Sequence, residues 1–164
     1  MAIAPVLGDS LAEVGDEVGI QLVERDDLKE RWVQCFSYFE SGKEYWEYYY
    51  SLSDLYIEVY AGRMQLWLVG DTKGHFGCFL TELRDYPKAR VFRFLFAGSN
   101  VEDGINKLSA GETYHEYMML WARKQGATHS EIFGRVGWKK VGERLGYEHL
   151  RICMRKDLSK VWSH

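Results

Sequence analysis

The chain has 164 residues, of which 46% are hydrophobic and 15% aromatic, so it can bury the core of one globular domain and is not a disordered chain. A net charge of -3 argues against nucleic-acid binding over the whole surface, because phosphate backbones require a positive footprint. No apolar run has the length of a membrane span, and no basic and apolar leader begins the chain. We therefore expect neither a nucleic-acid partner nor a membrane.

The cysteine and histidine residues show no spacing that predicts a metal site. Cys35, Cys78 and Cys153 lie far apart without a CxxC pair, and the five histidines are equally scattered. An odd number of distant cysteines is typical of reduced thiols in an intracellular protein or a virion interior.

Charge is distributed unevenly along the chain. Residues 1–19 contain four carboxylates and no Lys or Arg, whereas the segment after Trp121 is rich in basic residues. We predict an acidic N-terminal arm over residues 1–19 that meets the basic end within one chain or between copies. The alternative is that both segments are simply solvated faces.

The first elements predicted after the arm are a strand at 20–23 and a helix whose apolar residues recur from Leu28 to Phe39. A second helix is predicted over 43–56. Its aromatic residues extend around the helix, which predicts an exposed contact surface formed by Tyr45, Trp46, Tyr48, Tyr49 and Tyr50. The alternative is an aromatic-rich core.

An antiparallel meander is predicted next. Its strands are expected at 56–60, 64–69, 76–83 and 91–96, separated by Ala61-Gly62, by the segment GDTKGH and by a turn at Tyr86-Pro87. Trp67, Phe79 and Phe94 are predicted core positions.

The closing segment alternates helical and strand patterns. A capping box at Ser109 and Glu112 begins a helix that Gly126 ends, and a short strand follows at 129–134. A second helix ends at Gly146. From Tyr147 to Arg155 apolar and polar residues alternate, which predicts a final half-buried strand.

This order of elements resembles the GCN5-related N-acetyltransferase (GNAT) fold. The segment RVGWKKVGERLGY, with Leu145, Gly146 and Tyr147 at its end, is similar to the terminal helix of that family. The resemblance implies a single α/β (α+β) domain over 20–158, with a central mixed, mostly antiparallel sheet flanked by helices, and a C-terminal tail over 159–164. The pattern GR-x-GW around Trp138 is also similar to a small GNAT-like protein type of tailed bacteriophages.

The resemblance implies an acetyl-CoA site where two strands splay apart. The matching residues are Phe96, Gly98, Ser99 and Arg135, and backbone N–H groups after the strand would meet the pyrophosphate. The family's spaced glycines are absent, however, and Glu102 with Asp103 places two carboxylates where the phosphates belong.

The catalytic positions of the family are altered as well. Gly142 stands where many members place a tyrosine acid, and Arg135 stands where they place an asparagine. Glu82 and Glu131 are the candidate general bases, with His129 beside Glu131. Each of the three is otherwise a solvent-facing strand residue, and Ser99 is a helix cap rather than a nucleophile.

Three functions are compatible with these observations, and one of them is a toxin-like or host-inhibiting binder that uses the same scaffold and needs a host partner. The altered positions favour a GNAT fold used without cofactor as a structural or assembly component of a tailed-phage virion. Its partners would be other virion proteins or copies of itself, and its location the virion or the host cytoplasm. The alternative is an acetyl-CoA-dependent N-acyltransferase that acts on an amine, since backbone pairing with the cofactor needs no particular side chain.

Overall fold

The computed structural model describes residues 12–13, 18–102, 104, 108, 112–134, 137–150 and 154–158. The strands are β1 Ala12–Glu13, β2 Val18–Leu22, β3 Met64–Asp71, β4 Gly74–Tyr86, β5 Ala89–Ser99 and β6 His129–Ile132. The helices are α1 Leu28–Gln34, α2 Phe36–Ser41, α3 Lys43–Trp46, α4 Leu52–Tyr60, α6 Glu112–Lys124 and α7 Trp138–Arg144. Most of the predicted arm over 1–19, the Ser109 cap and the tail over 159–164 lie outside the described residues.

The strands form one mixed sheet in chain order from β1 to β6. Neighbouring strands are antiparallel from β1 to β5, whereas β6 runs parallel to β5. A parallel neighbour requires a crossover, and α6 supplies it between these two strands. The predicted α+β domain with a mixed, mostly antiparallel sheet is therefore confirmed.

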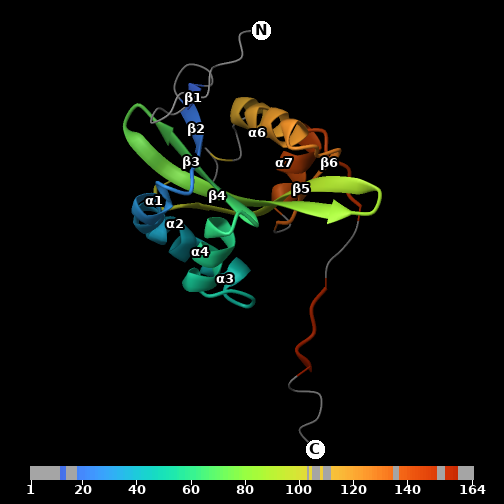
Figure 1. The fold of residues 1–164 in the computed structure, drawn as a ribbon, viewed down its shortest axis with the longest axis horizontal. Helices are drawn as coiled ribbons and strands as arrows, with labels where there is room; N and C mark the ends of the chain where they lie inside the picture. The colour runs from blue at the N-terminus through green and yellow to red at the C-terminus, as the bar shows by residue number, and fades with distance from the viewer. Residues whose placement is uncertain are drawn as a thin grey trace, which may run out of the picture.

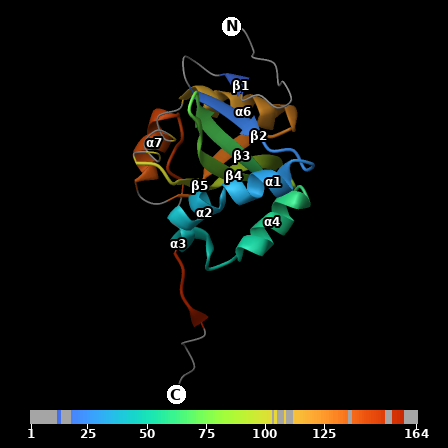
Figure 2. The ribbon, with the colours of Figure 1, turned by 90° about the vertical axis from the view of Figure 1, so that its left-hand side faces the viewer.

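Helices cover both faces of the sheet, as Figures 1 and 2 show, with α1 to α4 on one side and α6 and α7 on the other. The first layer encloses a core that includes Phe39, Leu66 and Leu80. The second layer encloses a separate core around Trp67 and Met118. Because strand side chains alternate between faces, β3 contributes Leu66 to the first core and Trp67 to the second.

The N-terminal helices differ from the predicted pair. The helix expected through Phe39 is divided at Cys35 into α1 and α2. Leu28, Trp32, Cys35 and Phe39 are buried as predicted, whereas Phe36, expected on the same face, is 45% exposed. The predicted helix over 43–56 is wrong, because α3 ends at Trp46 and a new helix starts at Leu52. The predicted strand at 56–60 lies in α4. The cause is a capping box in which Ser51 and Asp54 bond each other's backbone N–H groups.

No strand exists in the described part of the predicted final strand, residues 147–150 and 154–155. The Tyr147 hydroxyl turns inward and bonds Ser130 and His115 at 2.7 and 2.9 Å. Beyond it the apolar side of the pattern is exposed, with Leu150 72% and Met154 88% accessible. Alternation produces a strand only where one face finds a core to cover.

A buried polar bridge joins β3 and β4 inside the sheet. The Trp67 indole N–H donates to Thr81 Oγ1 at 2.9 Å, and the Thr81 hydroxyl donates to Gln65 Oε1 at 3.1 Å. Both Trp67 and Thr81 are fully buried. The bridge thus satisfies a donor that would otherwise lie in an apolar core.

We predict that Thr81→Val lowers the free energy of unfolding by about 1–3 kcal/mol, because it leaves the buried Trp67 N–H without an acceptor. Chemical denaturation followed by Trp fluorescence measures the loss. Thr81→Ser keeps the hydroxyl and is the matched control, so a Ser variant as unstable as the Val variant contradicts the explanation.

Candidate functional site

Strands β5 and β6 separate after four paired residues. Their register runs from Val91 opposite His129 to Phe94 opposite Ile132, and the Phe133 N–H donates to Phe94 O at 3.0 Å. β5 continues to Ser99 without β6 beside it. A gap therefore opens between the two strands at the point where the sequence resemblance places a cofactor.

The separation coincides with a bulge in β5. Leu80 pairs with Phe96 and Thr81 pairs with Phe94, so Leu95 has no residue opposite it on β4. A bulge bends its strand and increases the local twist. β5 therefore turns away from β6 at Leu95, the residue directly after the last one that pairs with β6.

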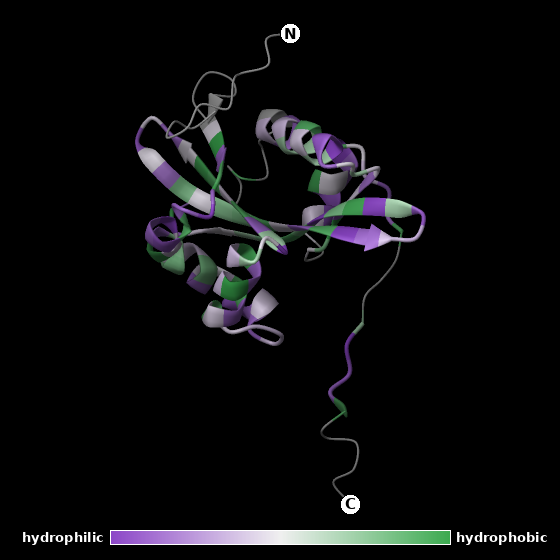
Figure 3. Ribbon diagram, viewed as in Figure 1, coloured by the Kyte–Doolittle hydropathy of each residue, from purple (hydrophilic) through white to green (hydrophobic). Residues whose placement is uncertain are grey.

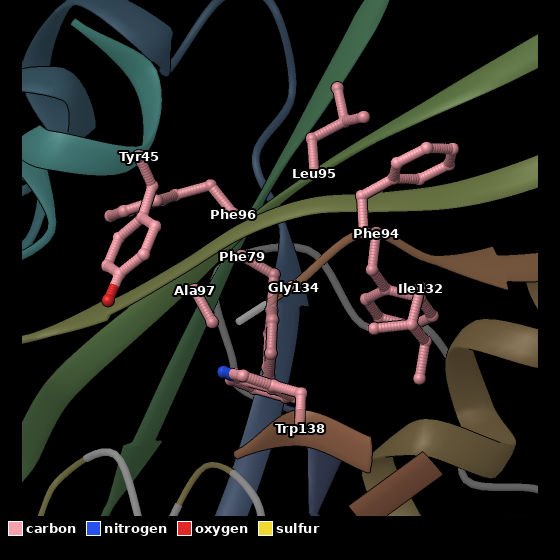
Figure 4. A pocket seen from close by; sticks show the side chains of 10 residues that line it. Tyr45, Phe79, Phe94, Leu95, Phe96, Ala97, Ile132, Gly134 and Trp138 are labelled. Carbon is pink, nitrogen blue, oxygen red and sulfur yellow. The ribbon is translucent and has the colours of Figure 1, made fainter. Parts of the chain in front are cut away.

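A pocket of about 290 Å³ occupies the gap. It is lined by Tyr45, Phe79, Phe94, Leu95, Phe96, Ala97, Ile132, Phe133, Gly134 and Trp138. Figure 4 shows Tyr45 entering from the α3 side and Trp138 from α7, with Ala97 between them on β5. Apolar walls beside an open strand edge suit an elongated ligand whose polar groups can pair with backbone. We refer to it as the splay pocket.

Among the described residues that were predicted to bind a cofactor, Phe96 alone lines the splay pocket, and Gly98 and Ser99 lie elsewhere on β5. Gly98 lies against the Tyr38 carbonyl and the Phe96 ring, where a Cβ atom would collide with both. The Ser99 hydroxyl donates to Phe76 O, and the Ser99 N–H donates to Ser41 Oγ at 3.3 Å. Arg135 lies outside the described residues.

The two candidate bases lie on either side of one arginine. Arg93 pairs with Glu82 across β4 and with Glu131 across β6, at 3.2 and 2.9 Å. All three side chains are at most 21% exposed. The Arg93 guanidinium lies 5.0 Å from the centre of the Phe133 ring, which lines the splay pocket. Glu82 and Glu131 are thus brought together beside the pocket, each held by an ion pair.

Arg93 and Trp138 are site residues that the sequence reasoning did not select. Trp138 belongs to the GR-x-GW motif, so the motif contained a signal for it. No local sequence signal marks Arg93. Only the strand register places it between two carboxylates that are 49 residues apart in the chain (131 minus 82).

The predicted aromatic contact surface is partly buried. Tyr45, Tyr48 and Tyr49 are 46%, 61% and 68% exposed. Trp46 is buried, and its indole N–H donates to Phe39 O at 3.0 Å, so the expectation that it is exposed is wrong. Tyr50 is half-buried. Burial, followed by the charges of Glu82 and Glu58, raises the pKa of Tyr50.

A polar chain crosses the second layer behind the pocket. Tyr147 joins Ser130 on β6 to His115 on α6, and the His115 ring stacks on Phe94 at a centroid distance of 5.9 Å. Burial raises the pKa of Tyr147, an effect that the hydrogen bond to Ser130 opposes. Gly142, at the position of the family's tyrosine acid, is buried and contributes no hydroxyl.

Burial lowers the pKa of His115 from its ordinary value of 6.5. The folded state then binds a proton less readily than the unfolded chain. As pH falls through the unfolded value, the unfolded state gains protons first, and the free energy of unfolding decreases. We predict that His115→Gln reduces this loss between about pH 7 and about pH 5, measured by urea denaturation at each pH.

The exposed His149 provides the control for this measurement. His149→Gln is expected to keep the pH dependence of the parent protein. An unchanged pH dependence in the His115 variant would show that its burial does not control acid stability.

Within the described residues, no group of three or more His, Cys, Asp or Glu side chains could hold a metal ion. In the same part of the chain, no helix is both long and apolar enough to cross a membrane. Cys35 and Cys78 are buried free thiols.

No protein-family model matches the sequence, and no curated protein matches it either. Solved structures do match the fold. Glucosamine-6-phosphate N-acetyltransferase from Arabidopsis thaliana is 12% identical, with a TM-score of 0.59 over 87% of this chain and 99% of that one. An aminoglycoside acetyltransferase from an uncultured soil metagenomic sample, in complex with sisomicin, is 10% identical, with a TM-score of 0.63 over 86% and 96%.

A third similar structure contains a CoA-based bisubstrate analogue. AAC(6')-Iy, in complex with the bisubstrate analogue CoA-S-monomethyl-acetylneamine, is 12% identical, with a TM-score of 0.60 over 87% of this chain and 99% of that one. Together these likenesses show that the chain has the fold of the GNAT acetyltransferases. At this level of identity they show the fold alone.

Proposed function

We propose that the splay pocket binds acetyl-CoA or a related acyl-CoA, and that the protein transfers the acyl group to an amine. The separation of β5 from β6 carries this proposal, because it forms an apolar pocket along an open strand edge. The similarity to AAC(6')-Iy, whose structure contains a CoA-based analogue, supports it.

The open part of β5 fits the amide-rich arm of a CoA molecule. Leu95, Phe96 and Ala97 all line the pocket beyond the last residue that pairs with β6. Their outward backbone groups can bond a ligand amide without any special side chain. The suitable stretch ends before Ser99, whose N–H is already used by Ser41. When bound, the cofactor supplies the acyl group as a thioester.

The charge beside the pocket suits an amine acceptor. Glu82 and Glu131 share the single guanidinium of Arg93, so the three groups carry a net charge of -1 (two carboxylates and one guanidinium). This favours an incoming ammonium group. One carboxylate then accepts the proton that the amine must lose before it attacks. Its ion pair with Arg93 has to loosen for this step, because the guanidinium already engages the carboxylate oxygen.

We expect isothermal titration calorimetry to detect acetyl-CoA binding with a dissociation constant between about 1 µM and 1 mM, the usual range for enzyme substrates. Ala97→Phe places a ring in the splay pocket and should weaken binding at least about tenfold by excluding the ligand. Ala61→Phe, at an exposed position beyond α4, is the matched control and should bind normally. The absence of any heat of binding at millimolar acetyl-CoA would reject the proposal.

Arg93→Met tests the arrangement of the acidic pair separately. It removes the shared cation from two carboxylates that are mostly buried, and we expect a loss of about 3–5 kcal/mol in the free energy of unfolding. Denaturation measured by circular dichroism checks this. The exposed ion pair between Arg90 and Asp85 is the control, because Arg90→Met should cost at most about 1 kcal/mol. Equal losses would show that burial does not strengthen the Arg93 pairs.

A role as a structural or assembly component of a tailed-phage virion is our second proposal. The exposed rings of Tyr45, Tyr48 and Tyr49 support it, since aromatic side chains with polar tips favour protein contacts. The partners would be virion proteins or copies of the chain, in the virion or the host cytoplasm. Absence of acetyl-CoA binding, together with the protein in purified particles, would favour this role. Absence of the protein from purified particles would reject the structural role.

A further inference from the structure

A second, open groove lies on the other side of α3 from the splay pocket. Whereas Tyr45 of α3 lines the pocket, the neighbouring part of α3 and the turn after it line a groove of about 550 Å³. We call it the tyrosine groove and define it by Glu40, Lys43, Glu47, Tyr48, Tyr49 and Asp54. The two recesses therefore share one short helix.

The charge of the tyrosine groove is negative. Three carboxylates and one ammonium group give a net charge of -2 along its wall. Lys43 pairs with Glu40 at 3.5 Å, and Asp54 is bonded to Ser51 in the cap of α4. Glu47 has no ion-pair partner within the described part of the chain. A cationic ligand would find uncompensated negative charge there.

The groove also presents two aromatic faces to solvent. Tyr48 and Tyr49 are 61% and 68% exposed, and their ring centres lie 6.4 Å apart at an angle of 54°. The face of an aromatic ring attracts a cation placed over it. Adjacent tilted rings beside carboxylates form a receptor for a guanidinium or ammonium group.

One basic residue of the chain already lies over these two rings. The Arg155 guanidinium lies 3.4 Å from the centre of the Tyr48 ring and 5.7 Å from that of Tyr49. The surrounding residues 154–158 have no helical or strand pairing apart from a single 3-10 residue, Leu158, and all five are exposed. Figure 3 shows this segment to be mainly hydrophilic.

We propose that the tyrosine groove binds an extended basic peptide, with an arginine or lysine side chain over Tyr48 and Tyr49, and that Arg155 acts as an internal competitor for these two rings. The groove charge of -2 is opposite in sign to the charge of residues 154–158, in which Arg155, Lys156 and Asp157 sum to +1. Because α3 borders both recesses, a peptide held here lies next to the splay pocket. Only the further step, that this peptide is the acyl acceptor, rests on the proposed function.

Peptide binding can be measured without any cofactor. The probe is a fluorescein-labelled peptide with the sequence of residues 154–158, MRKDL, titrated with the full-length protein and followed by anisotropy. We expect full-length Arg155→Ala to bind it at least about threefold more tightly than the parent protein, because a tethered competitor acts at roughly millimolar effective concentration. A probe with citrulline in place of arginine should bind more weakly, because the citrulline side chain carries no charge.

Three further variants in the Arg155→Ala protein identify the binding surface. Tyr48→Leu and Glu47→Gln should each weaken binding of the arginine probe, by about twofold to fivefold for an exposed cation–π or charge contact. Tyr60→Leu is the matched control. Tyr60 is also exposed and also carries an arginine, Arg25, at 4.0 Å from its ring, but it lies on α4 outside the groove.

The proposal is overturned if the parent and Arg155→Ala proteins bind the probe equally, or if Tyr48→Leu and Tyr60→Leu behave alike. Equal binding of the citrulline probe would also overturn it, since the groove would then not recognise charge. Circular dichroism of each variant verifies folding. A negative result leaves the acetyl-CoA titration unaffected, so failure of the peptide site and failure of the acyl-CoA site are distinguishable.

Discussion

The separation of β5 from β6 after Phe94 is the constraint on which the functional features of this protein depend. Four residue pairs hold the strands together, and a bulge at Leu95 then turns β5 away. Three packed elements keep the gap from closing, since α3, α7 and β4 all contribute side chains to the splay pocket. The pocket is thus a product of strand geometry, and its aromatic lining follows from the elements that meet there.

The ion pairs of Arg93 connect the strands next to this separation. Arg93 and Glu131 are opposite each other one residue before the last pair of β5 and β6. Together with Glu82 they link three neighbouring strands at the site where pairing ends. Buried charges contribute when their partners are well placed, and here two carboxylates share one guanidinium beside the splay pocket. The group that links the three strands is therefore the same one that we propose for proton transfer.

The first helical layer has two roles that meet at α3. Trp46 anchors this short helix through its bond to Phe39, while Tyr45 reaches the splay pocket and Tyr48 and Tyr49 face solvent in the following turn. Because Trp46 is fixed in the core, the exposed rings are held at defined positions. The pocket proposed for an acyl-CoA and the groove proposed for a cation are thereby both bordered by the same four residues.

The sequence by itself determined the strands β3 to β5 and the succession of α6, β6 and α7, because apolar periodicity and glycine positions are local properties. The mixed sheet and the opening after β5 were implied by the resemblance to the GNAT fold rather than by any local pattern. The sequence failed where capping or distant contacts decide the outcome. Ser51 and Asp54 start α4 where a strand was predicted, and Tyr147 bonds inward where a final strand was predicted. Only the tertiary structure placed Arg93 between Glu82 and Glu131 and Arg155 over Tyr48, since register and long-range packing bring together residues that no local pattern connects.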